Sequence, residues 1–155
     1  MVSRLLFAID GGALDRDALE VAVTFGTTYR VEVRVLRVRK GDCAHGYRYI
    51  ETNEEAWTPV NYAVFELRMA GVGASGQVVR APVDQVAQAI EQVARAWGAD
   101  AVLLGPGRRS RLGRILARPL ESRLEEILRL PIIVVPRSIR SGSGEPAPPT
   151  AARTP

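Results

Sequence analysis

The chain has few of the residues that build covalent or metal-bound frameworks. It contains one cysteine, Cys43, and one histidine, His45, among its 155 residues. A single cysteine excludes an intrachain disulfide and is consistent with a reducing compartment. One Cys and one His cannot complete a zinc site of four ligands, and a Ser-His-Asp arrangement would have to use His45 from a loop. We therefore expect neither a metal centre nor a histidine-based catalytic site.

Long apolar runs are also missing. The first apolar run, residues 5–9, is too short for a signal peptide and ends at Asp10. No other run approaches the roughly 20 residues of a membrane span. Apolar residues nevertheless make up 46% of the chain, enough to bury a core at this length. We expect a single globular domain in the cytoplasm, without contact to a membrane.

Lysine and aromatic residues are scarce, whereas arginine is abundant. Lys40 is the only lysine, the formal net charge is +4, and aromatic residues make up 6% of the chain. Several arginines crowd residues 105–118, a segment without aromatic side chains. Surfaces that bind RNA usually interleave aromatic and basic residues. Nucleic acid is therefore not the expected partner, although a basic module for another polyanion stays a third hypothesis.

Hydrophobic periodicity alternates between buried strands and helices along the chain. Strands are predicted at 5–9, 31–38, 77–80, 101–104 and 132–135, and helices at 13–25, 60–69, 82–97 and 116–128. This alternation predicts an open, doubly wound parallel sheet with helices on both faces. From residue 138 onward Ser, Gly, Pro, Ala and Thr dominate, so we expect a domain over 1–137 and a flexible tail over 138–155.

Several boundaries follow from local signals. Gly26 and Gly98 are expected to end the helices that precede them. Thr58 and Pro59 are expected to start the second helix. Charged residues alternate with valines in 31–38, which is typical of an exposed or edge-side strand. Residues 39–58 show no strong period and are expected to form a connection.

Two segments follow strands at the same expected edge of the sheet. Asp10 comes after the strand 5–9, and Gly105 opens the arginine-rich loop after the strand 101–104. Ligands of such sheets bind outside the carboxyl ends of the strands, where backbone N–H groups and a helix start favour phosphate. Asp10 would accept hydrogen bonds from a ribose or base. The alternative is that Asp10 and Asp15 only cap the first helix and the arginines form a solvated rim.

The string Gly71-Val72-Gly73-Ala74-Ser75-Gly76 matches the dinucleotide fingerprint in its letters. That fingerprint needs a strand before it and a helix after it. Here a helix precedes the string and a strand follows it. We expect a flexible helix-to-strand turn instead of a nucleotide site.

Three stretches together resemble the universal stress protein family. They are residues 5–11 followed by 18–22, residues 98–105, and residues 131–136. The likeness covers about residues 3–137 and is weakest over 39–58. It implies the strand order 3-2-1-4-5 and a homodimer that pairs the terminal strands, here Ile132, Ile133, Val134 and Val135.

In members of this family that bind ATP, a glycine motif holds the phosphates. Gly105 matches its first glycine, whereas Arg108 and Arg118 stand at the later glycine positions and Pro119 replaces the hydroxyl residue. Gly107 serves as the second glycine only with a shift of one residue. On the adenine side, the resemblance assigns roles to Asp10 and Val38.

Two functions remain open from the sequence. The first is a non-enzymatic, dimeric stress-response protein without tight ATP binding, because Arg108, Arg118 and Pro119 lose the glycines' close approach and the hydroxyl. The alternative is an adenine-nucleotide sensor or weak ATPase that uses Asp10, Val38 and the loop from Gly105 to Arg118. In that case arginine side chains bind the phosphates. No cofactor is certain, and ATP is the candidate.

Overall fold

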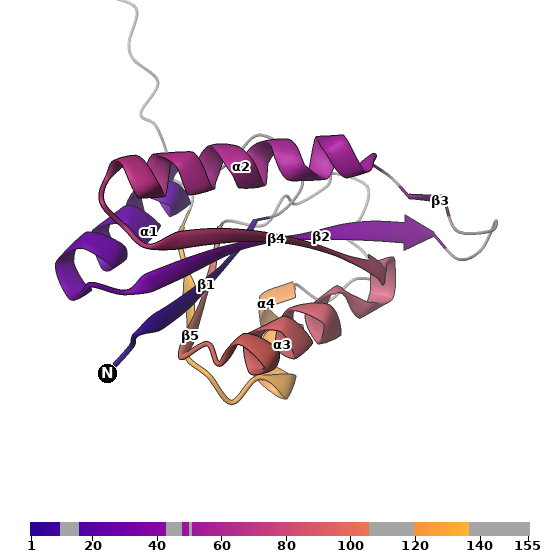
Figure 1. The fold of residues 1–155 in the computed structure, drawn as a ribbon. Coiled ribbons are helices and arrows are strands. Elements are labelled where there is room, and N and C mark those ends of the chain that lie inside the picture. Colours follow the sequence, from indigo (N-terminus) through magenta and orange to yellow (C-terminus); the bar gives the residue numbers. More distant parts are fainter. Residues whose placement is uncertain (10–15, 43–47, 50, 106–119, 137–155) are drawn as a thin grey trace, which may run out of the picture.

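A computed structural model describes residues 1–9, 16–42, 48–49, 51–105 and 120–136 of the chain. Strands and helices alternate along it, as predicted (Figure 1). The strands are β1 (Arg4–Ile9), β2 (Glu32–Asp42), β3 (Arg48–Tyr49), β4 (Ala74–Pro82), β5 (Ala101–Leu104) and β6 (Ile132–Val134). The helices are α1 (Arg16–Tyr29), α2 (Asn53–Met69), α3 (Val86–Trp97) and α4 (Leu120–Ile127), with a short 3-10 helix, η1 (Val83–Gln85), before α3.

The sheet is built around β1. This strand pairs in parallel with β2 on one side and with β5 on the other, β4 adds to β2, and β6 adds to β5. Counted among the parallel strands alone, the order is 3-2-1-4-5, which confirms the expected topology. The short β3 pairs antiparallel with the end of β2, where Gly41 faces Tyr49. The sequence predicted no strand within 39–58.

Two helical layers cover the two faces of the sheet (Figure 1). Phe7 of β1 packs in the core beneath α1 and α2, whereas its neighbour Leu6 packs in the core beside α3 and α4. All four residues of β5 are buried. A parallel strand that is covered on both faces is apolar throughout, which explains why the run 101–104 was predicted with its exact bounds.

The prediction that the second strand is exposed or lies at an edge is wrong. β2 is an interior strand, because it pairs with β1 and β4 along opposite edges. Its arginine side chains pack inside the fold instead of extending into solvent. The Arg34 guanidinium lies 4.7 Å from the centre of the Trp97 ring, and Arg37 and Arg39 are buried. Arginine can lie along apolar surface through its stem and stack on aromatic rings through its head.

The second helix begins earlier than predicted. α2 starts at Asn53, capped by Thr52, whose hydroxyl accepts a hydrogen bond from the N–H of Glu55 at 3.1 Å. The Glu55 carboxylate in turn accepts from the N–H of Thr52 at 2.7 Å. This capping box satisfies two N–H groups that would otherwise be unpaired. Pro59, expected at the first turn, therefore lies inside the helix.

Gly26 does not end the first helix, which continues to Tyr29. A Cβ at Gly26 would lie 2.4 Å from Cγ1 of Val72, so the glycine allows α1 to approach the chain after α2. Gly76 serves similarly, because its Cβ would lie 2.6 Å from Cγ1 of Val60 in α2. Gly98, by contrast, ends α3 with φ 73°, as predicted.

β2 extends well past the end of its central neighbour. Ile9, the last residue of β1, faces Arg37, and β2 continues from there to Asp42. At about 3.3 Å per residue the extension is about 16 Å long. β4 accompanies it as far as the pairing of Gly41 with Pro82.

At the amino ends of the strands, Asp100 joins the start of β1 to the start of β5. One carboxylate oxygen accepts hydrogen bonds from the N–H of Ser3 at 2.8 Å, the N–H of Arg4 at 2.8 Å and the Ser3 hydroxyl at 3.0 Å. These bonds, first that from the Ser3 N–H, hold the pKa of the Asp100 carboxyl below its usual value. They favour the charged form because all three donate to it.

Candidate functional site

The carboxyl ends of β1 and β5 lie together at one end of the sheet, beside Arg37 of the longer strand β2. β1 ends at Ile9, which faces Arg37 of β2, while Ala8 faces Leu104 at the end of β5. The first and fourth parallel strands are therefore neighbours, which is the arrangement that the expected binding crevice requires. The order of strands reverses at β1, and ligands of open α/β sheets bind at such a point.

Two of the predicted site residues lie beside the end of β1. Val38 follows Arg37 in β2 and is buried at 5% exposure, with its side chain in the core next to α3 and α4. Gly105 directly follows β5 and is half-buried. The two strands that carry them flank β1, so both residues lie at the expected edge.

The other predicted site residues lie outside the described part of the chain. Asp10 belongs to the segment 10–15 after β1. The segment 106–119 contains the remaining candidates, namely Gly107, Arg108 and Arg118, together with Pro119. Their contribution to a nucleotide site stays a prediction.

A buried ion pair occupies this edge, and the sequence did not reveal it. Arg37 Nε donates to Glu51 Oε1 and Arg37 Nη2 donates to Glu51 Oε2, each at 3.0 Å. The side chains are 6% and 18% exposed, and Arg37 Nη1 also donates to the carbonyl of Ile9 at 3.3 Å. A two-point Arg–carboxylate contact fixes both partners in direction. Arg37 therefore joins the end of β1 to the segment before α2.

Arg39 strengthens the same junction through the backbone. Its Nη2 donates to the carbonyl of Glu51 at 2.9 Å, and its Nε donates to that oxygen at 3.3 Å. Glu51 precedes Thr52, the cap of α2. Two arginines of β2 thus hold Glu51, two residues before α2 begins, and this explains how the start of α2 is positioned.

One sequence signal for this junction was available. Thr52 followed by Glu55 has the spacing of a capping box, which places the start of a helix directly after Glu51. The pairing of Glu51 with Arg37 had no local signal, because the two residues come from different elements and meet only through tertiary packing.

The described part of this end of the sheet offers backbone groups and few free polar side chains. Within the described ranges, no group of three or more His, Cys, Asp or Glu side chains could hold a metal ion. Both carboxylate oxygens of Glu51 accept hydrogen bonds from Arg37. Backbone groups at the strand ends and the half-buried Gly105 remain for a ligand.

The glycine-rich string does not contribute to this edge. Gly71, with φ 82°, lies in the turn after α2, and Ala74 already begins β4. The prediction of a helix-to-strand turn is thus correct for residues 71–73, whereas residues 74–76 belong to the strand. The string lies at the amino end of β4, at the opposite edge from the carboxyl ends of the strands.

Comparisons with known proteins find relatives that have the same fold. The model of the universal stress protein family matches residues 1–136. A universal stress family protein from Burkholderia pseudomallei superposes with a TM-score of 0.69 at 22% identity, covering 88% of this chain and 97% of its own. The universal stress protein from Archaeoglobus fulgidus in complex with dAMP superposes with a TM-score of 0.63 at 19% identity, covering 86% of this chain and 98% of its own. A universal stress protein in complex with cAMP superposes with a TM-score of 0.65 at 15% identity, covering 86% of this chain and 96% of its own.

No curated protein sequence matches the chain. In the portion that the structure describes, no helix has both the length and the apolar character to cross a bilayer. The family match extends over the whole described sheet and both helical layers. The chain therefore belongs to the universal stress protein family.

Proposed function

We propose that this chain is a non-enzymatic stress-response protein of the cytoplasm that acts as a homodimer. The observation that carries the proposal is the edge formed by β6. Ile132, Ile133 and Val134 are only half-buried, and within the described residues β6 pairs with β5 alone. An open apolar edge favours association with a second strand. A two-fold axis next to β6 would pair two copies of it.

The experiment compares the oligomeric state of the wild type and Val134→Lys by sedimentation. We expect a wild-type dimer, and a monomer after lysine is placed on the paired edge. Val134→Thr, which keeps the shape without the charge, should remain dimeric. Melting curves establish that each variant is folded.

Phe65→Lys is the matched control for added charge. Phe65 is 57% exposed on α2, and lysine there should leave the dimer intact. A monomeric wild type contradicts the proposed dimer. A dimer that survives Val134→Lys and dissociates in Phe65→Lys places the interface on α2 instead of β6.

A second candidate function is adenine-nucleotide binding at the carboxyl edge. Two structural neighbours contain dAMP and cAMP, and Val38 and Gly105 flank the end of β1. Asp10 would accept hydrogen bonds from the ribose or base. The phosphates would be bound by the loop that includes Gly107, Arg108 and Arg118, through its arginine side chains. Arg108 and Arg118 stand in place of glycine, and this favours the first candidate, a stress-response protein that does not bind ATP tightly.

Melting with millimolar ATP and magnesium separates the two candidates. A nucleotide that binds only the folded protein stabilises it by RT ln(1 + [L]/Kd), about 2.7 kcal/mol at 100 times Kd. An increase that disappears in Asp10→Ala supports the nucleotide sensor. An unchanged melting temperature excludes it and leaves the non-enzymatic dimer.

A further inference from the structure

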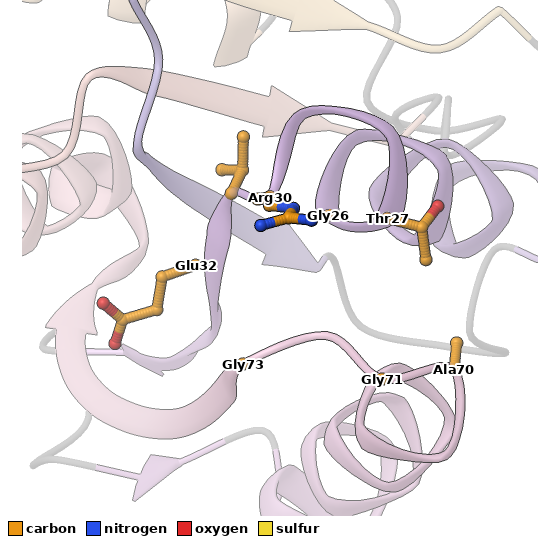
Figure 2. A pocket seen from close by; sticks show the side chains of 8 residues that line it. Gly26, Thr27, Arg30, Glu32, Ala70, Gly71 and Gly73 are labelled. Carbon is orange, nitrogen blue, oxygen red and sulfur yellow. The ribbon is translucent and has the colours of Figure 1, made fainter.

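A hollow lies at the amino end of the sheet, away from the strand ends described above. Its volume is about 500 Å³, between the ends of α1 and α2 and the starts of β2 and β4 (Figure 2). This volume lies within the range of about 300–1,000 Å³ that is usual for small-molecule sites. We call this cavity the amino-end hollow. Its lining residues are Gly26, Thr27, Arg30, Val31, Glu32, Ala70, Gly71 and Gly73.

Glycine backbone forms much of its wall. A Cβ at Gly71 would meet nothing within 4 Å, and a Cβ at Gly73 would meet only Glu32 Cγ at 3.9 Å. The space beside these residues is therefore open, and a ligand can approach the main chain closely.

Arg30 has an unusual backbone conformation for its residue type. Its φ is 54°, and it is the one residue other than glycine with positive φ among those described. It directly follows the last residue of α1, a position where glycine is common because the left-handed region strains other residues. Strain of this kind is often retained at sites where the side chain has a function.

The side chain of Arg30 is available for a ligand. Within the part of the chain that the structure describes, its guanidinium makes no hydrogen bond and no ion pair. Figure 2 shows it between the end of α1 and the turn that carries Gly71 and Gly73. A guanidinium offers a planar fork of donors that matches a carboxylate.

The remaining charges of the amino-end hollow are negative. Glu32 contributes a carboxylate that is half exposed, with Arg4 Nε at 3.9 Å, and it lies apart from the Arg30 guanidinium (Figure 2). α1 and α2 both end here, at Tyr29 and Met69, and helix carboxyl ends carry partial negative charge. A phosphate or sulfate would be repelled by these groups, and a simple cation would be repelled by Arg30.

We propose that the amino-end hollow binds a small zwitterion of the amino-acid type. Its carboxylate pairs with Arg30, and its ammonium group lies near Glu32 and the carbonyl groups that end α1 and α2. This site is separate from β6 and from the carboxyl edge of the sheet. Its existence does not depend on the proposed dimer or on nucleotide binding.

The test uses the full chain and titrates it with each of the twenty free amino acids, by calorimetry and by melting. We expect at least one to bind with a Kd below about 1 mM, an affinity accessible to a small charged ligand. Its N-acetyl derivative lacks the ammonium charge and its methyl ester lacks the carboxylate. Each should bind at least tenfold more weakly, because each loses one charged contact.

Arg30→Gly separates function from stability. Glycine removes the strain, so this variant should melt higher by roughly 3 °C, while its affinity for the amino acid falls at least tenfold. Glu32→Gln should also weaken binding, whereas Glu121→Gln on α4, which does not line the hollow, should not.

Three results would overturn the proposal. One is the absence of binding by every amino acid. Another is an Arg30→Gly variant that binds as the wild type does. The third is inorganic phosphate binding more tightly than any amino acid in a manner that requires Arg30.

Discussion

The two ends of the sheet differ in how their charges are used. At the carboxyl end, Arg37 is buried and joined to Glu51 and to the Ile9 carbonyl. At the amino end, the Asp100 carboxylate binds backbone N–H groups, and Arg30 carries a charge without a described partner beside a hollow. Ligands of open α/β sheets generally bind outside the carboxyl ends of the strands, which is the first of these two ends. The Arg30 guanidinium, which has no described partner, lies at the second.

The largest expected effect comes from breaking the buried ion pair. Glu51→Ala removes the carboxylate that binds the Arg37 side chain, which is 6% exposed. Removing one partner of such a pair typically destabilises by about 3 kcal/mol or more. Urea unfolding of the wild type and the variant measures this change in the free energy of unfolding.

The exposed pair on α3 provides the control. Glu91 and Arg95 form an ion pair one helical turn apart, with the Arg95 side chain 76% exposed. Glu91→Ala should change the free energy of unfolding by only about 0.5 kcal/mol. Equal effects at Glu51 and Glu91 would contradict the importance that we assign to the buried junction.

A smaller effect is expected from filling the close contact at the amino end. Gly26→Ala places a Cβ where Val72 Cγ1 lies 2.4 Å away. The helix or the turn must shift, which should destabilise by about 2 kcal/mol, as overpacking usually does. Gly73→Ala is the matched control, because its Cβ meets Glu32 Cγ at an ordinary 3.9 Å. If Gly26→Ala proves neutral in urea unfolding, the contact between α1 and the chain after α2 is not tight.

The smallest effect concerns Asp100 and depends on pH. Its pKa is lowered in the folded protein, chiefly by the Ser3 N–H. A group of this kind stabilises the fold above its unfolded pKa of about 3.9 and loses that contribution as pH falls through the lower folded value. Melting curves of the wild type and Asp100→Asn should therefore differ at neutral pH and converge below about pH 4. Parallel curves across that range would show that the carboxylate charge has no stabilising role.

The sequence predicted the sheet more accurately than its surroundings. The run 101–104 is apolar because both faces of β5 are covered, so its sequence alone predicts a buried strand at the correct place. The family resemblance supplied the strand order, and the pairing of β1 with both β2 and β5 confirms it. These features depend on local composition and on topology that related chains share.

The errors arose where tertiary contacts override local signals. The alternation of valine and arginine in 31–38 indicated an exposed strand, but Trp97 and Glu51 accept the arginines inside the fold. A glycine at position 26 is typical of a helix end, but here it lies inside α1. It provides the space that Val72, which is distant in the sequence, occupies. No local pattern reveals a partner that arrives from another element.

The extension of β2 past β1 gives the carboxyl end a mechanical asymmetry. Arg37 lies at the point where β2 loses β1 as a neighbour, about 16 Å from the tip of the strand at about 3.3 Å per residue. A force applied at the tip therefore acts through a lever arm whose fulcrum is the contact of Arg37 with Ile9 and Glu51. Because β3 and β4 pair with β2 up to this tip, pulling on it loads the three strands together, and the sheet should open first between them and β1.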